Sequence, residues 1–201
     1  MTSPACSSSP GLARERETQR GAGLVLAACG CEERLQFALG RAGEGGPRLL
    51  AAQQWTLPGQ GVRVLVPALG QALDFLDASP ADLTLLAAAR GPGGFTGIRL
   101  VLSALAGLAA GSGAAVAGFE YLPLLARGAA SFGPGTVLAF THARSRLAHV
   151  QAFRIGPPDA ARPLAPAQVL SYEAAAELAR TLAQSEEASA TSPLLLLGSA
   201  L

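Results

Sequence analysis

The hydrophobic positions of this chain follow two different periods, and the two periods alternate along the sequence. Short apolar runs bounded by glycine or turn residues, such as residues 23–31 and 83–88, are typical of buried strands. Apolar residues recur at helical spacing over residues 61–76 and again over residues 98–108. This alternation predicts a mixed α/β fold.

The turn signals divide the chain further. Residues 34–57 read as two extended pieces joined by the cluster GRAGEGGP, which predicts a hairpin. The second half repeats the order in a poorer form, with a helix over 171–184 that Ser171 caps. The other elements expected there are a strand at 114–119, a helix at 120–130, two strands joined around 143–146, a proline-rich loop at 156–166 and a last strand at 192–201. The pattern predicts two lobes with a break near residues 111–120.

Composition narrows the function classes. A chain of 201 residues suits one medium domain or two small lobes. Half of the residues are hydrophobic but only 5% are aromatic, so Ala, Leu and Val must build the core. The net charge of +1 gives no long-range attraction to nucleic acid or membrane. All 15 basic residues are Arg, which excludes a Schiff-base lysine and the lysine of a Walker A loop.

The three cysteines make no disulfide framework and indicate a reducing compartment, and the polar start of the chain indicates an extension. Residues 1–20 are rich in Ser and Pro and lack the apolar run of a signal peptide, so we expect a disordered extension. No segment reads as membrane-spanning, and we expect a cytoplasmic protein. Cys6 lies in the extension, whereas Cys29 and Cys31 share one face of an extended segment. A metal site would need two further ligands, so small buried thiols are the simpler interpretation.

The stretch ARGPGGFTGIRL, residues 89–100, gathers four glycines just before a helix. It could be a phosphate cradle, a tight strand-to-helix corner or a docking surface. It lacks the lysine of a Walker A loop, and Thr96 stands where a dinucleotide fingerprint has its third glycine. Thr96 is the expected N-cap of the helix. The local chemistry favours the corner.

The helix that follows carries a ridge of small residues, Ser103, Gly107 and Gly111, spaced by four. Small residues at this spacing allow another helix to approach closely. Glycine inside a helix costs up to ~1 kcal/mol relative to alanine, so a close contact is expected in return. The sequence does not decide whether this ridge packs against the helix at 61–76 or against a helix of a partner.

The glycine stretch resembles the signature of the TsaB (YeaZ) family, R-G-P-G-S-F-T-G-[VL]-R-x-G-x-x-x-A-x-G-L-A. Gly94 replaces the usual serine of that signature. Residues 24–39 and 137–153 resemble the first and second hairpins of the family, and residues 194–201 a late strand. The matching positions are Arg90, Gly91, Pro92, Gly93, Phe95, Thr96, Gly97, Arg99, Gly107, Leu108 and Ala109.

The resemblance implies an actin/Hsp70-like (ASKHA) fold of two ribonuclease-H-like lobes. The first lobe, with its interface helices, would span residues 21–112, and a shortened second lobe residues 113–201. The resemblance also implies an accessory, non-catalytic subunit of the complex that makes N6-threonylcarbamoyladenosine in tRNA. Such a subunit pairs with a catalytic TsaD subunit and a TsaE ATPase, or with itself when alone. It would meet tRNA only through the complex, hold no metal or cofactor by itself, and meet ATP or ADP only at the partner interface.

The resemblance also implies which residues form the site. The signature loop is residues 90–97, including Gly94. The predicted partner interface uses the two helices at 61–76 and 97–110, with Val62, Leu65, Leu69, Ile98, Arg99, Ser103, Gly107 and Gly111.

Several positions depart from the family pattern. Cys29 and His142 stand where the family has Asp, and the family's His near Gln60 is absent. Because ATP hydrolysis needs carboxylates to hold magnesium, the chain is expected to lack catalysis. The alternatives are a degenerate enzyme, sugar-kinase-like or peptidase-like with a metal at His142 and His149, and a paralogue with another partner. Arg99, Arg144 and Arg146 could touch phosphates or form a solvated surface.

Overall fold

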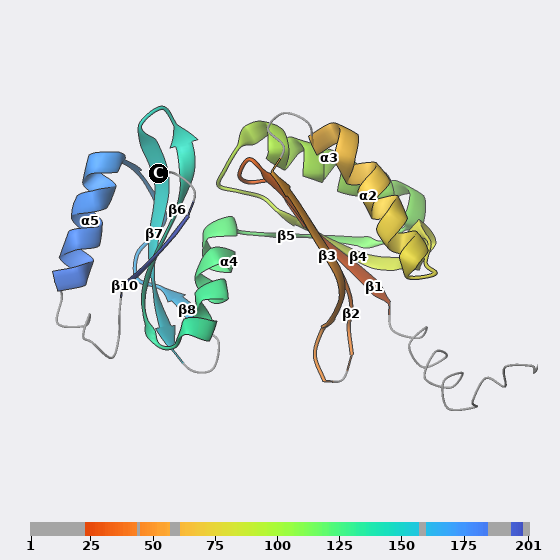
Figure 1. Cartoon of the computed structure of the whole chain (residues 1–201), viewed down its shortest axis with the longest axis horizontal. Coiled ribbons are helices and arrows are strands. Elements are labelled where there is room, and N and C mark those ends of the chain that lie inside the picture. The colour runs from red at the N-terminus through yellow and green to blue at the C-terminus, as the bar shows by residue number, and fades with distance from the viewer. Residues whose placement is uncertain (1–22, 44, 57–60, 157–159, 185–193, 199–201) are drawn as a thin grey trace, which may run out of the picture.

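The structure is a computed structural model that describes residues 23–43, 45–56, 61–156, 160–184 and 194–198. The expected extension at residues 1–20 and Cys6 lie outside these residues. Two β-sheets, each with its own helices, stand side by side (Figure 1).

The first sheet has the strand order β3-β2-β1-β4-β5. Strands β1, β2 and β3 pair antiparallel, and β4 and β5 continue from β1 in parallel. The strands are β1 (Leu24–Cys29), β2 (Arg34–Arg41), β3 (Arg48–Thr56), β4 (Leu83–Ala89) and β5 (Ala115–Phe119). The predicted hairpin is therefore β2–β3, and the predicted buried strands are β1 and β4.

Two helices cover one face of this sheet. They are α2 (Gly61–Phe75) and α3 (Phe95–Ser112), and a short 3-10 helix (Pro80–Asp82) leads into β4. Alternate residues of β1 and β2 face these helices and are buried. Trp55 packs on this side against Phe37, with ring centroids 5.8 Å apart. The core includes Leu26, Leu39, Leu65, Leu69, Leu73, Leu86, Val101 and Leu105.

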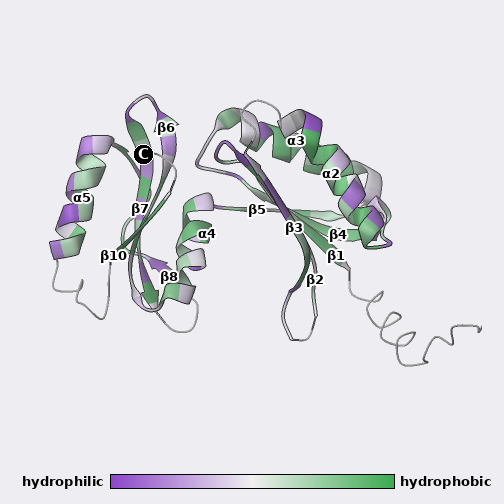
Figure 2. Cartoon of the chain, viewed as in Figure 1, coloured by the Kyte–Doolittle hydropathy of each residue, from purple (hydrophilic) through white to green (hydrophobic). Residues whose placement is uncertain are grey.

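Helix α3 is unusually apolar and little buried. By length and composition alone it could cross a membrane, but core helices of soluble proteins pass the same test. Its buried residues are Val101 and Leu105, which pack in the core beneath α2 and α3. Many residues along α2 and α3 are hydrophobic (Figure 2).

The second sheet repeats the pairing pattern of the first. The hairpin β6 (Gly135–Arg144) and β7 (Leu147–Gly156) is antiparallel, like β1 and β2. Strand β10 (Leu194–Gly198) runs parallel to β6, as β4 does to β1. Strands β8 (Ala160–Pro163) and β9 (Gln168–Ser171) pair antiparallel with β7, in the place of β3. The two lobes therefore share one strand plan, as predicted.

Helices cover both faces of the second sheet. Helix α4 (Tyr121–Gly128), followed by a 3-10 helix (Ala129–Phe132), packs on one face, and α5 (Tyr172–Gln184) on the other (Figure 1). Phe153 is fully buried on the α4 face. Ser171 caps α5 as expected, since its hydroxyl accepts a hydrogen bond from the Ala174 N–H at 3.1 Å.

Two features of the fold correct the sequence analysis. The break between the lobes falls after β5, because Ala115 to Phe119 pair with β4 in the first sheet, so residues 113–119 do not belong to the second lobe. The predicted proline-rich loop contains β8, and the following β9 was not expected. The prolines of this segment argue against a strand. Pro163 is nevertheless the last residue of β8, which pairs only with β7, and a proline without an N–H is tolerated in such an edge strand.

Candidate functional site

The glycine loop, residues 90–94, turns the chain from β4 into α3. Gly91 and Gly93 have φ angles of +117° and +153°, which favour glycine. The Gly94 N–H donates to the Cys31 carbonyl at 2.5 Å, and the Tyr121 N–H donates to the Gly91 carbonyl at 2.8 Å. The loop thus joins the β1–β2 turn to the start of α4.

Close backbone contacts explain why so many glycines gather here. A Cβ at Gly93 would clash with the carbonyl group of Cys31, and one at Gly97 would clash with the carbonyl group of Gly30. The hairpin carbonyl oxygens therefore lie against the loop and the first turn of α3. Carbonyl oxygens repel an anion, so the geometry supports a tight corner and disfavours a phosphate cradle.

The expected N-cap is wrong. Helix α3 begins at Phe95, its N-cap is Gly94, and Thr96 is already inside the first turn. No side chain caps the helix, and the Gly94 N–H instead donates to the Cys31 carbonyl, which ties the start of α3 to the β1–β2 turn.

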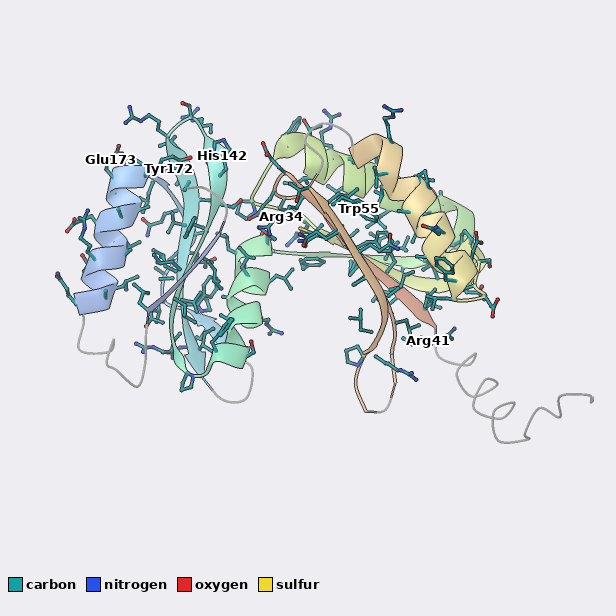
Figure 3. All side chains as sticks on the ribbon, viewed as in Figure 1. Arg34, Arg41, Trp55, His142, Tyr172 and Glu173 are labelled. Carbon is teal, nitrogen blue, oxygen red and sulfur yellow. The ribbon has the colours of Figure 1, made fainter. Side chains whose placement is uncertain are left out.

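A buried carboxylate lies beside the loop, between the two lobes. The Glu32 side chain is only 4% exposed and pairs through Oε2 with Arg34, whose Nε donates at 3.0 Å. The second oxygen, Oε1, has no hydrogen-bond partner among the described residues. Figure 3 places Arg34 where the hairpin approaches α4. Glu33, the other carboxylate of the β1–β2 turn, is exposed, so Glu32 is the buried negative charge there and Arg34 neutralises it.

Glu32 also affects its neighbours. Its hydrogen bond raises the pKa of Arg34. Burial, and secondarily the Glu32 charge, raises the pKa of the Tyr121 hydroxyl well above its ordinary range. Tyr121 is therefore a neutral, buried hydroxyl at neutral pH and not a general base.

The two histidines do not form a metal site. In the β6–β7 register Thr141 is opposite His149 and His142 is opposite Ala148, so the two histidines point to opposite faces of the sheet. His142 Nδ1 instead lies 3.3 Å from the Tyr172 hydroxyl at the start of α5 (Figure 3). Burial, and next the charge of His142, lowers the pKa of His149. Across the described parts of the chain, no three His, Cys, Asp or Glu side chains gather as metal ligands.

The predicted interface residues divide between core and surface. Leu65 and Leu69 are buried against the sheet, so their side chains are unavailable to a partner. Ile98 packs half-buried beside Cys31 and Tyr121. The side chain of Val62 lies outside the described part of the structure.

The small ridge of α3 faces outward. Ser103, Gly107 and Gly111 are exposed, and a Cβ at either glycine would meet no described atom within 4 Å. At the start of the helix the Arg99 guanidinium lies 5.0 Å above the ring centroid of Phe95, itself 71% exposed. The ridge is therefore not packed inside the lobe, which answers the question that the sequence left open.

Apolar residues that the sequence analysis did not select flank this ridge. Val66 on α2 is 65% exposed, and Leu102 on α3 is also exposed. The side chains between the two helices and β1 leave a small apolar pocket of about 40 Å³, lined by Leu26, Ala28, Leu65, Val66, Leu69, Ala104, Leu105 and Leu108. Val66 directly follows Leu65 and so lies on another side of α2, but helical spacing alone does not tell which of these sides faces the sheet. We call Val66, Leu102, Ser103, Gly107 and Gly111 the outer face.

The repeated strand pairing and the glycine corner define a two-lobed protein of actin/Hsp70-like fold. The family model of tRNA N6-adenosine threonylcarbamoyltransferase, TsaD, matches residues 61–188, and the chain belongs to this family. Within it the chain is TsaB (YeaZ)-like, which confirms the resemblance found in the sequence.

Two solved structures from Pseudomonas aeruginosa support that placement. One is YeaZ, and the other is described as an uncharacterized protein with similarity to peptidase YeaZ. Each is 25% identical to this chain, covers 74% of it and superposes with a TM-score of 0.64. The matches span 68% and 67% of those two chains, respectively. Among curated proteins, none matches this chain.

Proposed function

We propose that this chain is a non-catalytic partner subunit in the making of N6-threonylcarbamoyladenosine in tRNA. It binds a TsaD-type catalytic subunit through the outer face of α2 and α3, and a TsaE-like ATPase joins the pair. The observation that carries this proposal is the outward-facing ridge of Ser103, Gly107 and Gly111 between exposed apolar neighbours. Membership of the TsaD family and likeness to YeaZ supply the reaction system.

The outer face has the shape that a helix partner needs. Small residues every fourth position form a groove along α3 that a helix backbone can approach closely. Val66 and Leu102 supply exposed apolar area beside the groove. Without a TsaD-type subunit, a second copy of this chain uses the same face.

The site between the lobes supports the absence of catalysis. Cys29 and His142 occupy the hairpin positions where the resemblance implies Asp. The nearby carboxylate, Glu32, is already paired with Arg34. We therefore propose that the protein binds no metal by itself and contacts ATP or ADP only at the partner interface. We also propose that it acts in the cytoplasm and meets tRNA only through the complex.

Gly107→Leu tests the interface. The added side chain points to solvent in the free chain, so the variant should fold and melt like the native protein. It should push a partner helix away and weaken binding of a purified TsaD-type subunit at least ~10-fold, which corresponds to about 1.4 kcal/mol. Ala176→Leu, on the exposed side of α5, adds a leucine to a helix surface of the other lobe and is the matched control.

Calorimetric titration, thermal melting and mass spectrometry of the modified tRNA nucleoside separate the outcomes. Lost binding with an unchanged melting temperature supports the proposal, provided that Ala176→Leu binds normally. Native-like binding by Gly107→Leu would overturn the proposed interface.

A second assay tests the absence of catalysis. The purified chain alone should show no ATPase or peptidase turnover. Turnover that disappears in Glu32→Gln would contradict this part of the proposal, because it would assign the activity to the chain and not to a contaminant.

A further inference from the structure

Two thiols lie one residue apart in the sequence at the end of β1, in the buried cluster that also contains Ala89 and Tyr121. Cys29 ends the strand, Gly30 follows, and Cys31 begins the turn to β2. Both thiols are free and buried, with Cys29 8% and Cys31 1% exposed, and both belong to one buried cluster. Tyr121 and Ile98 complete their surroundings.

The environment makes the two thiols unequal. The hydrogen bond with Cys31 lowers the pKa of Cys29, although burial opposes this shift. The same hydrogen bond, and next burial, raises the pKa of Cys31 far above its ordinary value. In such a pair, the thiol with the lower pKa is suited to attack a disulfide, and the other thiol is suited to resolve the mixed disulfide.

The backbone of this dithiol is joined to the glycine loop. The Cys31 carbonyl accepts the hydrogen bond from the Gly94 N–H, and Gly30 lies so close to Gly97 that neither could carry a Cβ without a clash. Any rearrangement between Cys29 and Cys31 therefore acts on the first turn of α3.

We propose that Cys29 and Cys31 form a redox-active dithiol that exchanges with a small-molecule disulfide and closes a bridge across Gly30. This site lies beyond the proposed function and does not depend on it. Glutathione disulfide represents the chemical class of the oxidant. Cys29, the more exposed thiol, is the attacking group, and Cys31 is the resolving group.

The exchange has two balanced steps. The Cys29 thiolate attacks one sulfur of the small disulfide, whose S–S bond breaks, and the departing thiolate takes up the proton that Cys29 lost. Cys31 then loses its proton and attacks the Cys29 sulfur of the mixed disulfide, which releases the second small thiol. Two electrons pass from the protein to the small disulfide, and two small thiols leave.

Forming the disulfide between Cys29 and Cys31 would shift the backbone that contacts the glycine loop. A disulfide holds its two Cα atoms within ~4.4–6.8 Å, and here a single glycine separates them. The Cys31 carbonyl belongs to the backbone that must adjust, so the hydrogen bond to the Gly94 N–H weakens. The oxidation state of the pair is thereby linked to the start of α3.

The test uses the full chain with Cys6→Ser, so that two thiols remain. The protein is equilibrated in buffers of reduced and oxidised glutathione across the poise of about −180 to −300 mV and analysed by intact mass after alkylation. We expect a chain that has lost both free thiols and carries no glutathione. In the oxidised form, the Gly94 amide should exchange with deuterium at least ~10-fold faster, a ratio that equals about 1.4 kcal/mol.

Single substitutions assign the roles. Cys31→Ser should trap glutathione on Cys29, whereas Cys29→Ser should react far more slowly. Cys→Ala versions of both provide the same comparison if a serine disturbs the packing. Thermal melting of each variant shows that it is folded.

Three results would overturn the proposal. Both thiols could stay free at the most oxidising poise, each could carry its own glutathione, or the bridge could form only in denaturant. An unchanged exchange rate at Gly94 in a bridged chain would refute the link to α3.

Discussion

The two lobes share one strand plan but place their helices differently. In the second lobe, α4 and α5 cover opposite faces of one sheet, and Phe153 is fully buried beneath α4. In the first lobe, α2 and α3 lie on the same face, so each has an inner side against the sheet and an outer side without a described neighbour. The helices of both lobes complete a core with their inner sides, but in the first lobe the outer sides of two neighbouring helices together form one exposed surface.

This difference teaches that strand pairing alone does not decide what a helix does. Helix α5 carries a polar outer side, as a helix that faces water should. Helix α3 instead carries glycines and apolar residues on its outer side. A surface of that composition is typical of a contact with another macromolecule.

The largest expected contrast is between the buried face of one lobe and the outer face of the other. Phe153→Ala should lower the free energy of unfolding by ~3–5 kcal/mol, because it leaves a cavity beneath α4. Val66→Ser, at an exposed position of α2, should change it by no more than about 0.5 kcal/mol. Urea unfolding of both variants measures the difference, and equal losses would show that the outer face of α2 is part of a core.

The next contrast in stability is between a partly buried ion pair of the first lobe and an exposed ion pair of the second lobe. Arg34→Ala leaves the buried Glu32 carboxylate unpaired and should cost ~1–3 kcal/mol. Arg146→Ala breaks the exposed pair with Glu173 in the second lobe, at 3.5 Å, and should cost less than ~1 kcal/mol. Adding Glu32→Gln to Arg34→Ala should recover part of the loss. A double variant no more stable than Arg34→Ala would show that the charge of Glu32 is not the cause.

Two glycines of α3 test its two sides. Gly97→Ala forces a Cβ against the Gly30 carbonyl and should destabilise the fold by ~1–3 kcal/mol. Gly107→Ala meets no described atom and should stabilise the helix by up to ~1 kcal/mol. The same sign for both in thermal melting would contradict the assignment of inner and outer sides.

The smallest effect concerns pH and the second lobe. Because burial lowers the pKa of His149 in the folded chain, the unfolded chain binds more protons below its ordinary value of 6.5. Stability is therefore full above this value and falls as the pH drops toward the folded pKa. The melting temperature should fall slightly between about pH 7.5 and about pH 5.5, and the fall should shrink in His149→Gln. An identical fall in the variant would assign it to other groups.

Much of the fold follows from local sequence. Short apolar runs placed β1 and β4, helical spacing placed α2 and α3, and the Ser171 cap marked the start of α5, all close to their observed bounds. Strands β8 and β9 were missed because they are short and lie among prolines, and they form only through pairing with β7. The break between the lobes lies within the predicted residues 111–120, but β5 belongs to the first lobe because it pairs with β4, and pairing between distant segments leaves no local signal.

The candidate site followed the sequence less closely. The glycine signature identified the corner, and the spacing of Ser103, Gly107 and Gly111 identified the ridge. Periodicity could not tell Leu65 and Leu69, which face the sheet, from Val66, which faces outward, without knowing which side of α2 meets β1. The pairing of Glu32 with Arg34 and the opposite orientation of the two histidines depend on strand register, which only the structure supplies.

Trp55 is the sole tryptophan of the chain, and it lies in the first lobe against Phe37. Its emission therefore reports the unfolding of one lobe, while far-ultraviolet circular dichroism reports both. Coincident transitions by the two probes would mean that the lobes unfold as one cooperative unit. A ligand that binds only the first lobe would then raise both midpoints together, whereas independently unfolding lobes would show the shift in fluorescence alone. The molecule thus carries a built-in optical reporter of how tightly its halves are coupled.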